Sequence, residues 1–522
     1  MRSATRCILC STALVVSALN ALAGDWPQYG GPDGKWVASA GDHEYLKDWS
    51  KARLVWTSET AEIGPGRGQA PRYGFRNAAA KGGIDPWGGA ASPIVVDGLL
   101  YQLYLRPVGK AYNKAVVEKI EKQWRDREGF SIEHLRRNFS IEAETVVVAL
   151  DLKSGKTAWT QAFRGVQYHG DFAKPRGSNN SPAAGDGKVF VLGYDYVLRA
   201  HDAKTGKVLW QTKQPADYAN QLQAMIAAES NVLRDGPKKV AEAKTLYAPP
   251  LRYADGVVLY SLDSRTLIAV DGKTGTELWQ AKNAIDRRQV VGIWRREAGS
   301  CLITVSRGGT VACIEARNGK RLWELTGKGE TFQPTVAGDL LLINETNTGK
   351  GQPVAQLGCY RMSDTQAEQL WVNTEEQQLT HAGASVRLFH SNRFVIGSWA
   401  GPLTHKDGKK QGRAALRFFD AKTGKVDEPL RLLPGVEHTS LAPDSMVTTV
   451  GDLLYVENDS HHQSNTTRTI VDLKTNKVVQ YNSPFVTAGG YGGTVTNQPI
   501  VDGRLYLRCV DGHIRCYDVT AP

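Results

Sequence analysis

One eleven-residue pattern, Ala-x-Asp-x-x-x-Gly-x-x-x-Trp, constrains the fold of this chain more than any other feature. It occurs at residues 149–159, 200–210 and 269–279, with a looser copy at 313–323. Alternating apolar residues before the acidic residue predict a strand, and the following glycine predicts a tight turn, because glycine takes a positive φ without strain. The Trp falls in a second strand, where its ring can pack between neighbouring sheets. Each copy is therefore predicted to be a β-hairpin.

Weaker copies of the pattern continue to the end of the chain. They centre on Arg361, Asp420, Asp472 and Asp518, so the acidic column recurs eight times at spacings of 44 to 69 residues. A four-stranded unit repeated about every 40 to 50 residues is typical of a β-propeller. We therefore predict an all-β chain that forms an eight-bladed β-propeller of four-stranded antiparallel blades.

The two ends of the chain predict how the ring closes. The eighth copy stops at Pro522, before a Trp strand can form, while residues 52–59, with Trp56, have the form of that missing strand. Pairing this segment with the last blade would remove the open edges of the ring. We expect the propeller to be closed by its N-terminal strand.

The first 23 residues have the features of a secretory signal peptide. Arg2 and Arg6 precede a mostly apolar stretch, and residues 21–23 have the small-x-small pattern of a cleavage site. We expect cleavage near Ala23, a mature propeller domain over residues 24–522, and a periplasmic or secreted location. The mature chain has no stretch of 18 or more apolar residues, so no transmembrane segment is expected.

Cysteine content and charge limit the possible functions. Five cysteines would remain after cleavage, which is not a disulfide framework, and no Cys-x-x-Cys-His motif for c-type haem occurs. Cys313, Cys359 and Cys516 occupy the small-residue column of the repeat and are expected to be buried. The net charge of +11 suits either an acidic partner, such as an anionic polysaccharide, or ordinary solubility. Nucleic acid is not expected as a partner.

The repeat resembles the tryptophan-docking motif of pyrroloquinoline quinone (PQQ)-binding-like β-propellers, the quinoprotein alcohol dehydrogenase-like superfamily. Residues 25–32, Asp-Trp-Pro-Gln-Tyr-Gly-Gly-Pro, resemble the start of many bacterial members. The resemblance implies the fold but leaves the chemistry open, because the family includes alcohol dehydrogenases that bind PQQ with calcium or a lanthanide. It also includes outer-membrane-assembly propellers, which bind no cofactor and present a surface to partners. The adjacent Cys-Cys pair of the dehydrogenases is missing here, and Glu428 and Gln480 stand at Trp positions.

The loops of one face of the predicted ring are longer than those of the other. This loop-rich face carries the glycine-rich residues 64–89 and residues 168–180, whereas the opposite face has short Lys-Thr-Gly or Asp-Gly turns. Arginines here could clamp a carboxylated ligand, such as the quinone or an acidic sugar, or brace the loops by bonding carbonyls. The histidine spacing predicts no metal site. The candidate cofactor-binding residues are Arg72, Arg76, Arg176, Asn180, His169, His381 and His438.

Two insertions, at about residues 107–143 and 215–244, are predicted to be helical from their periodicity. They could cover the central funnel, dock a partner or simply pack on the propeller. Two functions follow from the whole pattern. The first is a binding or scaffold protein that holds a protein or a cell-envelope polysaccharide on its loop-rich face. The alternative is a PQQ-dependent oxidoreductase acting on an alcohol or sugar, with no catalytic residue identified. The missing Cys-Cys pair and haem motif favour the first.

Overall fold

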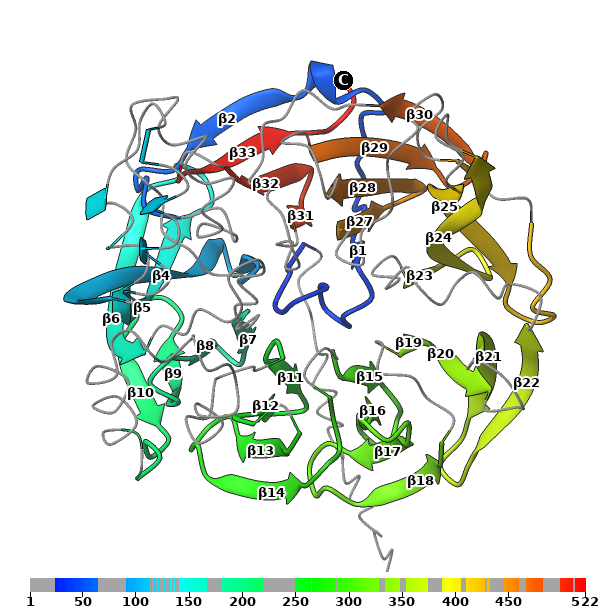
Figure 1. The fold of residues 1–522 in the computed structure, drawn as a ribbon, viewed down its shortest axis with the longest axis horizontal. Helices are drawn as coiled ribbons and strands as arrows, with labels where there is room; N and C mark the ends of the chain where they lie inside the picture. The colour runs from blue at the N-terminus through cyan, green and yellow to red at the C-terminus, as the bar shows by residue number, and fades with distance from the viewer. Residues whose placement is uncertain are drawn as a thin grey trace, which may run out of the picture.

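Eight sheets arranged around a central axis form the computed structural model (Figure 1). This confirms the predicted all-β, eight-bladed propeller of mostly four-stranded antiparallel blades. The structure describes residues 24–63, 91–112, 140–166, 181–216, 249–263, 265–286, 290–327, 334–347, 354–373, 387–404, 410–427, 430–431, 446–459, 466–481, 498–509 and 512–522, with residue 218 and scattered positions between 114 and 136.

The strands of each blade follow one another in the sequence. The first blade consists of β3 (Ile94–Val96), β4 (Leu99–Tyr112), β5 (Ser140–Asp151) and β6 (Thr157–Val166), and the second of β7 (Ala183–Gly185), β8 (Lys188–Leu192), β9 (Leu198–Asp202) and β10 (Val208–Gln211). The third consists of β11 (Arg252–Ala254), β12 (Val257–Tyr260), β13 (Leu267–Asp271) and β14 (Glu277–Ala281), and the fourth of β15 (Gly292–Trp294), β16 (Cys301–Val305), β17 (Val311–Glu315) and β18 (Arg321–Leu325). The fifth blade consists of β19 (Thr335–Ala337), β20 (Leu340–Asn347), β21 (Val354–Met362) and β22 (Ala367–Asn373), and the sixth of β23 (Arg387–His390), β24 (Arg393–Thr404), β25 (Lys410–Asp420) and β26 (Leu430–Arg431). The seventh consists of β27 (Met446–Val450), β28 (Leu453–Asp459), β29 (Thr466–Asp472) and β30 (Lys477–Tyr481), and the eighth of β31 (Ile500–Val501), β32 (Arg504–Arg508) and β33 (Ile514–Asp518).

Two N-terminal strands join the last two blades. β1 (Val37–Ala38) pairs parallel with β27, so the seventh sheet has five strands. β2 (Arg53–Thr57) pairs antiparallel with β33, with Trp56 opposite Cys516, and is the outermost strand of the eighth sheet. A short 3-10 helix, η1 (Trp49–Lys51), lies between them in the sequence. In Figure 1 these blue elements lie beside the orange and red strands of the C-terminal blades.

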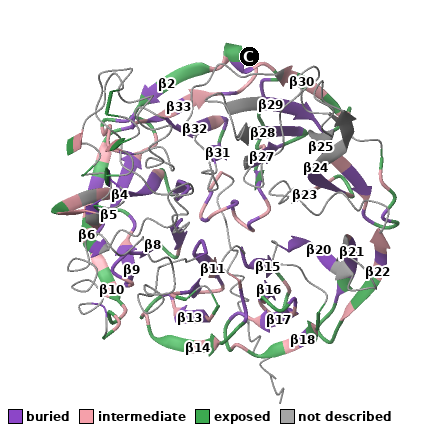
Figure 2. Ribbon diagram, viewed as in Figure 1, coloured by how far each residue is buried: buried purple, intermediate pink, exposed green. Residues whose placement is uncertain are grey.

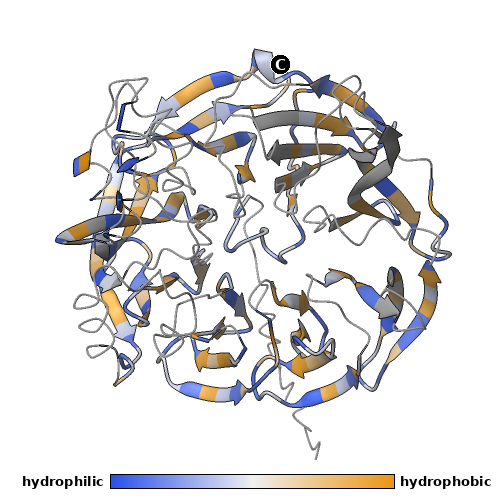
Figure 3. Cartoon of the chain, viewed as in Figure 1, coloured by the Kyte–Doolittle hydropathy of each residue, from blue (hydrophilic) through white to orange (hydrophobic). Residues whose placement is uncertain are grey.

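The hydrophobic core lies between neighbouring blades, and residues become more exposed toward the rim of the ring (Figure 2). Ala200 in β9 is fully buried, whereas Leu209 in the outer strand β10 is 46% exposed. Figure 3 shows that apolar and polar residues alternate along the outer strands β14 and β18. One face of each outer strand therefore packs inward while the other meets solvent.

The acidic residue of the repeat caps the turn after the third strand of a blade. Asp151 Oδ1 accepts hydrogen bonds from the backbone N–H of Ser154 at 2.9 Å and of Lys153 at 3.2 Å. The Ser154 hydroxyl also donates to it, and these bonds hold the pKa of Asp151 below its usual range. Gly155 follows with φ of 70°. Asp202, Asp271 and Asp420 cap equivalent turns in their own blades.

Six tryptophans of the outer strands dock onto the next blade. In each case the indole Nε1 donates to a backbone carbonyl in the turn after the third strand of that blade, at 2.7 to 3.1 Å. The six pairs are Trp56 with Leu152, Trp159 with Ala203, Trp210 with Gly272, Trp279 with Ala316, Trp323 with Ser363 and Trp371 with Ala421. Trp371 is a docking residue that the repeat pattern missed, because the turn before it is two residues longer than in the other copies.

The glycine of the repeat makes room for the docking ring. A Cβ placed on Gly206 would lie 2.6 Å from the ring of Trp159, and one on Gly275 would lie 2.5 Å from the ring of Trp210. Both glycines also have positive φ, at 72° and 74°. Glycine is therefore required twice at this position, by the backbone conformation and by the neighbouring indole.

Part of the first predicted helical insertion is strand. β4 continues to Tyr112 and β5 begins at Ser140, so residues 107–112 and 140–143 are strand rather than helix. The two strands are long enough to pair beyond the body of the blade. Between them, the backbone N–H of Arg125 donates to the carbonyl of Glu121, as in one helical turn. Helical structure over the whole insertion stays a prediction, and the second insertion lies almost entirely outside the described residues.

The five cysteines that the structure describes are buried and unbridged. Cys313 and Cys359 are fully buried, and Cys516 is 1% exposed, which confirms their predicted packing role. Burial raises the pKa of the Cys359 and Cys516 thiols to about 12. These thiols therefore stay protonated at neutral pH and act as small apolar side chains.

Candidate functional site

The seven candidate residues predicted on the loop-rich face all lie outside the described residues. Arg72, Arg76, Arg176, Asn180, His169, His381 and His438 therefore stay predictions. The structure does describe the segment at the axis of the ring and the short turns at one end of the blades, whereas much of the loop-rich face lies outside the described residues. The described regions show how the axis and the blade junctions are built.

An N-terminal segment, residues 24–38, crosses the axis of the ring and is called the axial segment here. In Figure 1 it is the blue trace in the centre, among the innermost strands of several blades. It starts at the first blade, where Trp26 and Val95 exchange backbone hydrogen bonds at 2.7 and 2.9 Å. The Pro27 carbonyl then accepts from the backbone N–H of Ala184 in the second blade at 2.8 Å. The Trp26 side chain is fully buried.

The axial segment next contacts the third blade. Gln28 Oε1 accepts from the backbone N–H of Tyr253 at 3.1 Å. The Tyr29 carbonyl accepts from Arg252 Nη1 at 2.6 Å. Arg252 Nε donates to the Val291 carbonyl, which leads into the fourth blade, at 3.0 Å. One arginine therefore joins the axial segment to two blades.

Glycine again allows a close approach at this point. Gly34 has φ of 69°, and a Cβ there would lie 2.4 Å from Arg252 Nη2. The Arg252 side chain is 1% exposed, and burial lowers its pKa to about 10. It is therefore still charged at neutral pH, with carbonyl oxygens as its hydrogen-bond partners. Sequence reasoning missed Arg252 because its partner Tyr29 is more than 200 residues away.

The axial segment reaches the fourth and seventh blades through its second half. Arg295 Nε donates to Asp33 Oδ1 at 2.6 Å. The Trp36 carbonyl accepts from the backbone N–H of Thr449 at 2.8 Å, where β1 begins to pair with β27. The Trp36 ring meets that of Tyr29 edge-on, with ring centroids 4.7 Å apart. Backbone or charged contacts thus tie the segment to five of the eight blades.

Most of these contacts lie toward one end of the axis, although Arg252 and Val291 stand at the other end of their short inner strands. Val95 and Ala184 precede the tight turns at Asp97 and Asp186, which join the first and second strands of their blades. Val450, opposite Ala38, precedes the equivalent turn of the seventh blade. The axial segment therefore covers the short-turn end of the axis. The opposite end belongs to the loop-rich face.

Arg508 is a buried cation at the other end of the eighth blade. It is fully buried at the end of β32, and its Nη1 donates to the Ala91 carbonyl at 2.8 Å. Its Nε and Nη2 have no hydrogen-bond partner among the described residues, and burial lowers its pKa to about 9. The sequence offered no motif that singled out this arginine.

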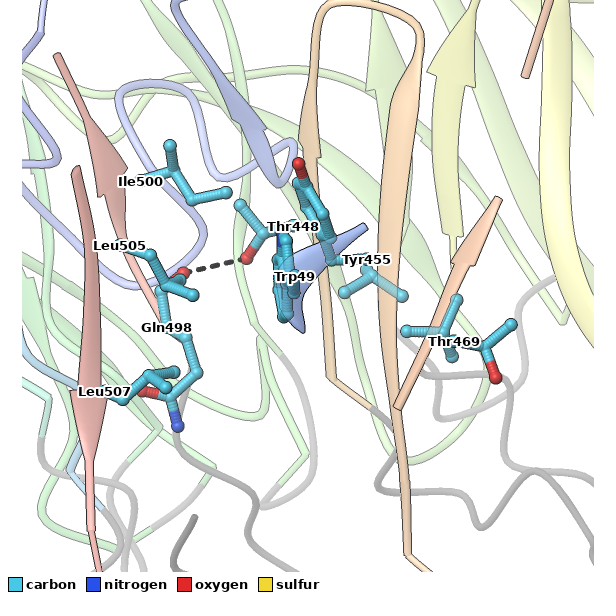
Figure 4. A pocket seen from close by; sticks show the side chains of 10 residues that line it. Trp49, Thr448, Tyr455, Thr469, Gln498, Ile500, Leu505 and Leu507 are labelled. Atoms are coloured by element: carbon cyan, nitrogen blue, oxygen red, sulfur yellow. Dashed lines mark hydrogen bonds between the residues drawn. The ribbon is translucent and has the colours of Figure 1, made fainter. Parts of the chain in front are cut away.

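A small cavity lies between the seventh and eighth blades (Figure 4). It has a volume of about 30 Å³ and is lined by Trp49, Tyr455, Leu507 and their neighbours. The rings of Trp49 and Tyr455 stack with centroids 4.2 Å apart, and Thr448 Oγ1 donates to the Gln498 carbonyl at 2.9 Å. This volume suits a water molecule rather than an organic ligand, since small-molecule pockets measure roughly 300–1,000 Å³.

A larger cleft of about 480 Å³ lies between the third and fourth blades on the loop-rich face. Arg265, Lys282, Arg307 and Arg321 contribute positive charge to it, and Glu324 is its acidic residue. We call it the cationic cleft. In the described part of the chain no three His, Cys, Asp or Glu side chains are placed to hold a metal ion. Nor does any helix of that part have the length and apolar character to cross a membrane.

Sequence comparisons indicate one family. The family model described as outer membrane protein assembly factor BamB matches residues 121–248 and 263–519, more than half of the chain. A protein of that name from Shewanella oneidensis is 23% identical over 351 residues, which cover 62% of this chain and 80% of the relative. Its namesake from Burkholderia pseudomallei is 26% identical over 157 residues, which cover 28% of this chain and 41% of that relative. The second match thus spans less than half of the relative's length.

Matches among solved structures have low sequence identity. A europium-containing methanol dehydrogenase is 14% identical with a TM-score of 0.48, and the match covers 93% of this chain and 89% of that one. The BamB structure from Moraxella catarrhalis is 14% identical with a TM-score of 0.42, over 72% of this chain and 94% of that one.

Proposed function

Because this chain belongs to the PQQ-repeat β-propeller family whose model is described as outer membrane protein assembly factor BamB, we propose that it is an exported scaffold protein. In this proposal it holds a protein partner on the loop-rich face of its ring. The signal peptide predicted for residues 1–23 would deliver it to the periplasm. No catalytic residue is assigned.

The observation that carries this proposal is the difference between the two ends of the axis. At the short-turn end the axial segment covers the innermost strands and is hydrogen-bonded to them, for example through Trp26 and Pro27. The loop-rich end holds the longer connections and the cationic cleft. Binding sites are found most often on loops held by a rigid scaffold. A partner is therefore expected at the loop-rich end.

The relatives suggest the class of partner. They are named as outer membrane protein assembly factors, so the partner proposed here is a protein of the machinery that assembles outer-membrane proteins. Propeller blades fixed by docking tryptophans and by the axial segment would present a surface that changes little on binding, which lowers the entropic cost of association.

The quinone alternative can be compared with the described residues. Arg508 is a buried guanidinium of the kind that could meet a carboxylate. The described residues provide no group of three metal ligands beside it, so they do not account for a site for a quinone with its metal. The test below therefore includes this alternative as an outcome.

Site-specific crosslinking tests the proposed face. A photo-crosslinking amino acid would replace Lys213, which follows β10 toward the loop-rich face, or Lys204, in the turn at the opposite end of the same blade. Both side chains are exposed, so the two variants form a matched pair. In cells, we expect position 213 to crosslink a component of the outer-membrane assembly machinery, identified by mass spectrometry. Equal crosslinking to that component from position 204 would contradict the proposal.

A quinone-binding measurement separates the two functions. The purified mature protein would be mixed with PQQ and calcium or a lanthanide, and quinone absorbance and dye reduction would be followed. We expect no saturable binding and no substrate-dependent reduction. Reduction of the dye with an alcohol or sugar would overturn the scaffold proposal in favour of an oxidoreductase.

A further inference from the structure

The cationic cleft is formed by three connections that all reach the loop-rich face. Arg265 lies in the turn between β12 and β13, and Arg307 lies in the turn between β16 and β17. Residues 282–285 connect β14 of the third blade to the fourth blade. The cleft is therefore built from both sides of one blade junction, which fixes its basic residues relative to one another.

The positive charge of the cleft is not balanced by its own residues. Glu324 accepts a hydrogen bond from Arg321, which leaves Arg265, Lys282 and Arg307. None of these three side chains forms an ion pair with another described residue. Asp263 is close in sequence, but its Oδ1 accepts from the backbone N–H groups of Arg265 and Thr266 at 2.9 and 2.7 Å. The cleft thus keeps a surplus of three cations.

This arrangement differs from other arginines of the same ring. Arg295 is paired with Asp33, Arg106 with Glu144, and Arg199 with Asp195, each within hydrogen-bond distance. The chain pairs these arginines with carboxylates yet leaves three cations together in the cleft. All three side chains are exposed, so an anionic ligand that entered the cleft could pair with them without first breaking an ion pair to another described residue.

The connections that carry these cations are braced by backbone hydrogen bonds. The Ser306 N–H donates to the Thr310 carbonyl at 2.9 Å, and the Thr310 N–H donates to Ser306 Oγ at 3.1 Å. The Ile285 N–H donates to the Arg265 carbonyl at 3.2 Å, which joins two of the connections. The site is therefore largely formed before a ligand arrives, which favours affinity.

Hydroxyl groups of the cleft suit a ligand with many hydroxyls of its own. Thr304, Ser306, Thr310 and Thr326 line it together with the amide of Asn283. Thr304 is 1% exposed, whereas Ser306 and Thr310 are half-buried and Thr326 is exposed. The last three therefore provide the hydroxyls that a ligand in the cleft can reach.

From these observations we propose that the cationic cleft binds a short acidic saccharide. Its sugar carboxylates would meet Arg265, Lys282 and Arg307, and its hydroxyls would bond to Ser306, Thr310 and Thr326. The volume of about 480 Å³ falls in the range of small-ligand pockets, roughly 300–1,000 Å³. A protein interface is a broader surface than this. The site is independent of the partner proposed above.

Calorimetry with defined oligomers tests this site on the purified mature protein. The probe is a trisaccharide of galacturonic acid, and the uncharged trisaccharide of galactose and a triglutamate peptide are compared with it. We expect saturable binding of the acidic trisaccharide that weakens with added salt, because ion pairs at an open cleft are screened. Absence of saturable binding would overturn the proposal. Equal or tighter binding of triglutamate would overturn the saccharide class.

A matched pair of variants locates the binding. Arg307→Glu changes the cleft, whereas Arg317→Glu changes an exposed arginine at the other end of β17 in the same blade. We expect Arg307→Glu to weaken trisaccharide binding by about tenfold or more, since it replaces a charge-assisted bond with repulsion. Arg317→Glu should leave it unchanged, and both variants should keep the wild-type melting curve. Equal weakening in both would show general charge attraction and overturn the site. Crosslinking at Lys213 is a separate readout, so either proposal can fail alone.

Discussion

Two kinds of blade junction hold this ring together. At six junctions an outer-strand tryptophan docks onto a carbonyl of the next blade. The sixth and seventh blades have Glu428 and Gln480 at the tryptophan position of the pattern. At the junction of the seventh and eighth blades, Gln480 Oε1 instead accepts from the backbone N–H of Trp49, and its Nε2 donates to Asp48. The N-terminal region thus supplies a ring, Trp49, where the repeat has none.

The comparison shows that a local motif and a segment distant in the sequence can both hold neighbouring blades together. Trp49 is 3% exposed and stacks on Tyr455 of the seventh blade. Its fit is less complete than that of a docked tryptophan, because the small cavity of Figure 4 remains beside it. β1 and the ion pair between Lys47 and Asp472 hold the same region to the seventh blade. The last two blades therefore depend on contacts made across more than 400 residues.

Removing Trp49 should have the largest effect. Trp49→Ala is expected to lower the free energy of unfolding by about 3–5 kcal/mol, since a buried aromatic side chain leaves a cavity that already adjoins another. Trp210→Ala, at a docked junction, removes a ring that is only partly buried and should cost less. Denaturant unfolding gives both values. Hydrogen exchange should accelerate in β28 and β32 for Trp49→Ala. Faster exchange in the second and third blades instead would refute the comparison.

Two glycines separate the roles of backbone conformation and tryptophan docking. Gly206 and Gly187 have φ of 72° and 69°, but only Gly206 faces a docked ring, while a Cβ on Gly187 would meet nothing within 4 Å. Gly187→Ala should cost about 1–2 kcal/mol from the left-handed conformation. Gly206→Ala should cost about 1–3 kcal/mol more, because its Cβ would overlap Trp159. Equal losses in urea unfolding would mean that the indole moves aside freely.

The sequence predicted the ring because its information is local and repeated. Asp151, Gly155 and Trp159 lie within one hairpin, so their spacing reports the turn and the docking directly. Trp371 does not fit the pattern, because the turn before it is two residues longer than in the other copies. The partners of Trp49 and Arg252 lie on distant segments, and no periodicity connects them. Sequence patterns therefore could not predict the contacts of the axial segment.

The same distinction explains what was learned about the site. The predicted candidates, such as Arg72 and His169, were chosen from loop composition and remain untested. The cationic cleft was missed because Arg265, Lys282 and Arg307 belong to different turns, and each looks like an ordinary exposed residue in the sequence. Only the packing of the third blade against the fourth brings them together.

Acid should loosen the N-terminal contact through protonation of Asp472. Although burial alone would raise the pKa of Asp472, hydrogen bonds from Lys47 and the Thr475 N–H hold it below its usual range. A lowered carboxyl pKa stabilises the fold above about pH 4, and the contribution is lost as pH falls through the folded-state pKa. Asp472→Asn should therefore cost about 1 kcal/mol at neutral pH and less below pH 4. The measurement is the free energy of unfolding as a function of pH, with a substitution of the exposed Asp42, Asp42→Asn, as the control. The same pH response in both variants would contradict the prediction.

The smallest effect is expected from a substitution at the turn of the seventh blade. Asn476, with φ of 53°, stands where five of the other turns have glycine, and residues 425–434, which include the outer strand of the sixth blade, contain no tryptophan. Asparagine tolerates this conformation, so Asn476→Gly should change the free energy of unfolding by no more than about 0.5 kcal/mol.

The reverse change at a docked junction, Gly206→Asn, should cost several times more, because its side chain would meet Trp159. Both values come from urea titration of the purified protein. A large loss from Asn476→Gly would show that the asparagine side chain is needed in the turn. A small loss from Gly206→Asn would show that glycine serves the backbone alone, and the contrast between the two kinds of junction would then rest on the tryptophans only.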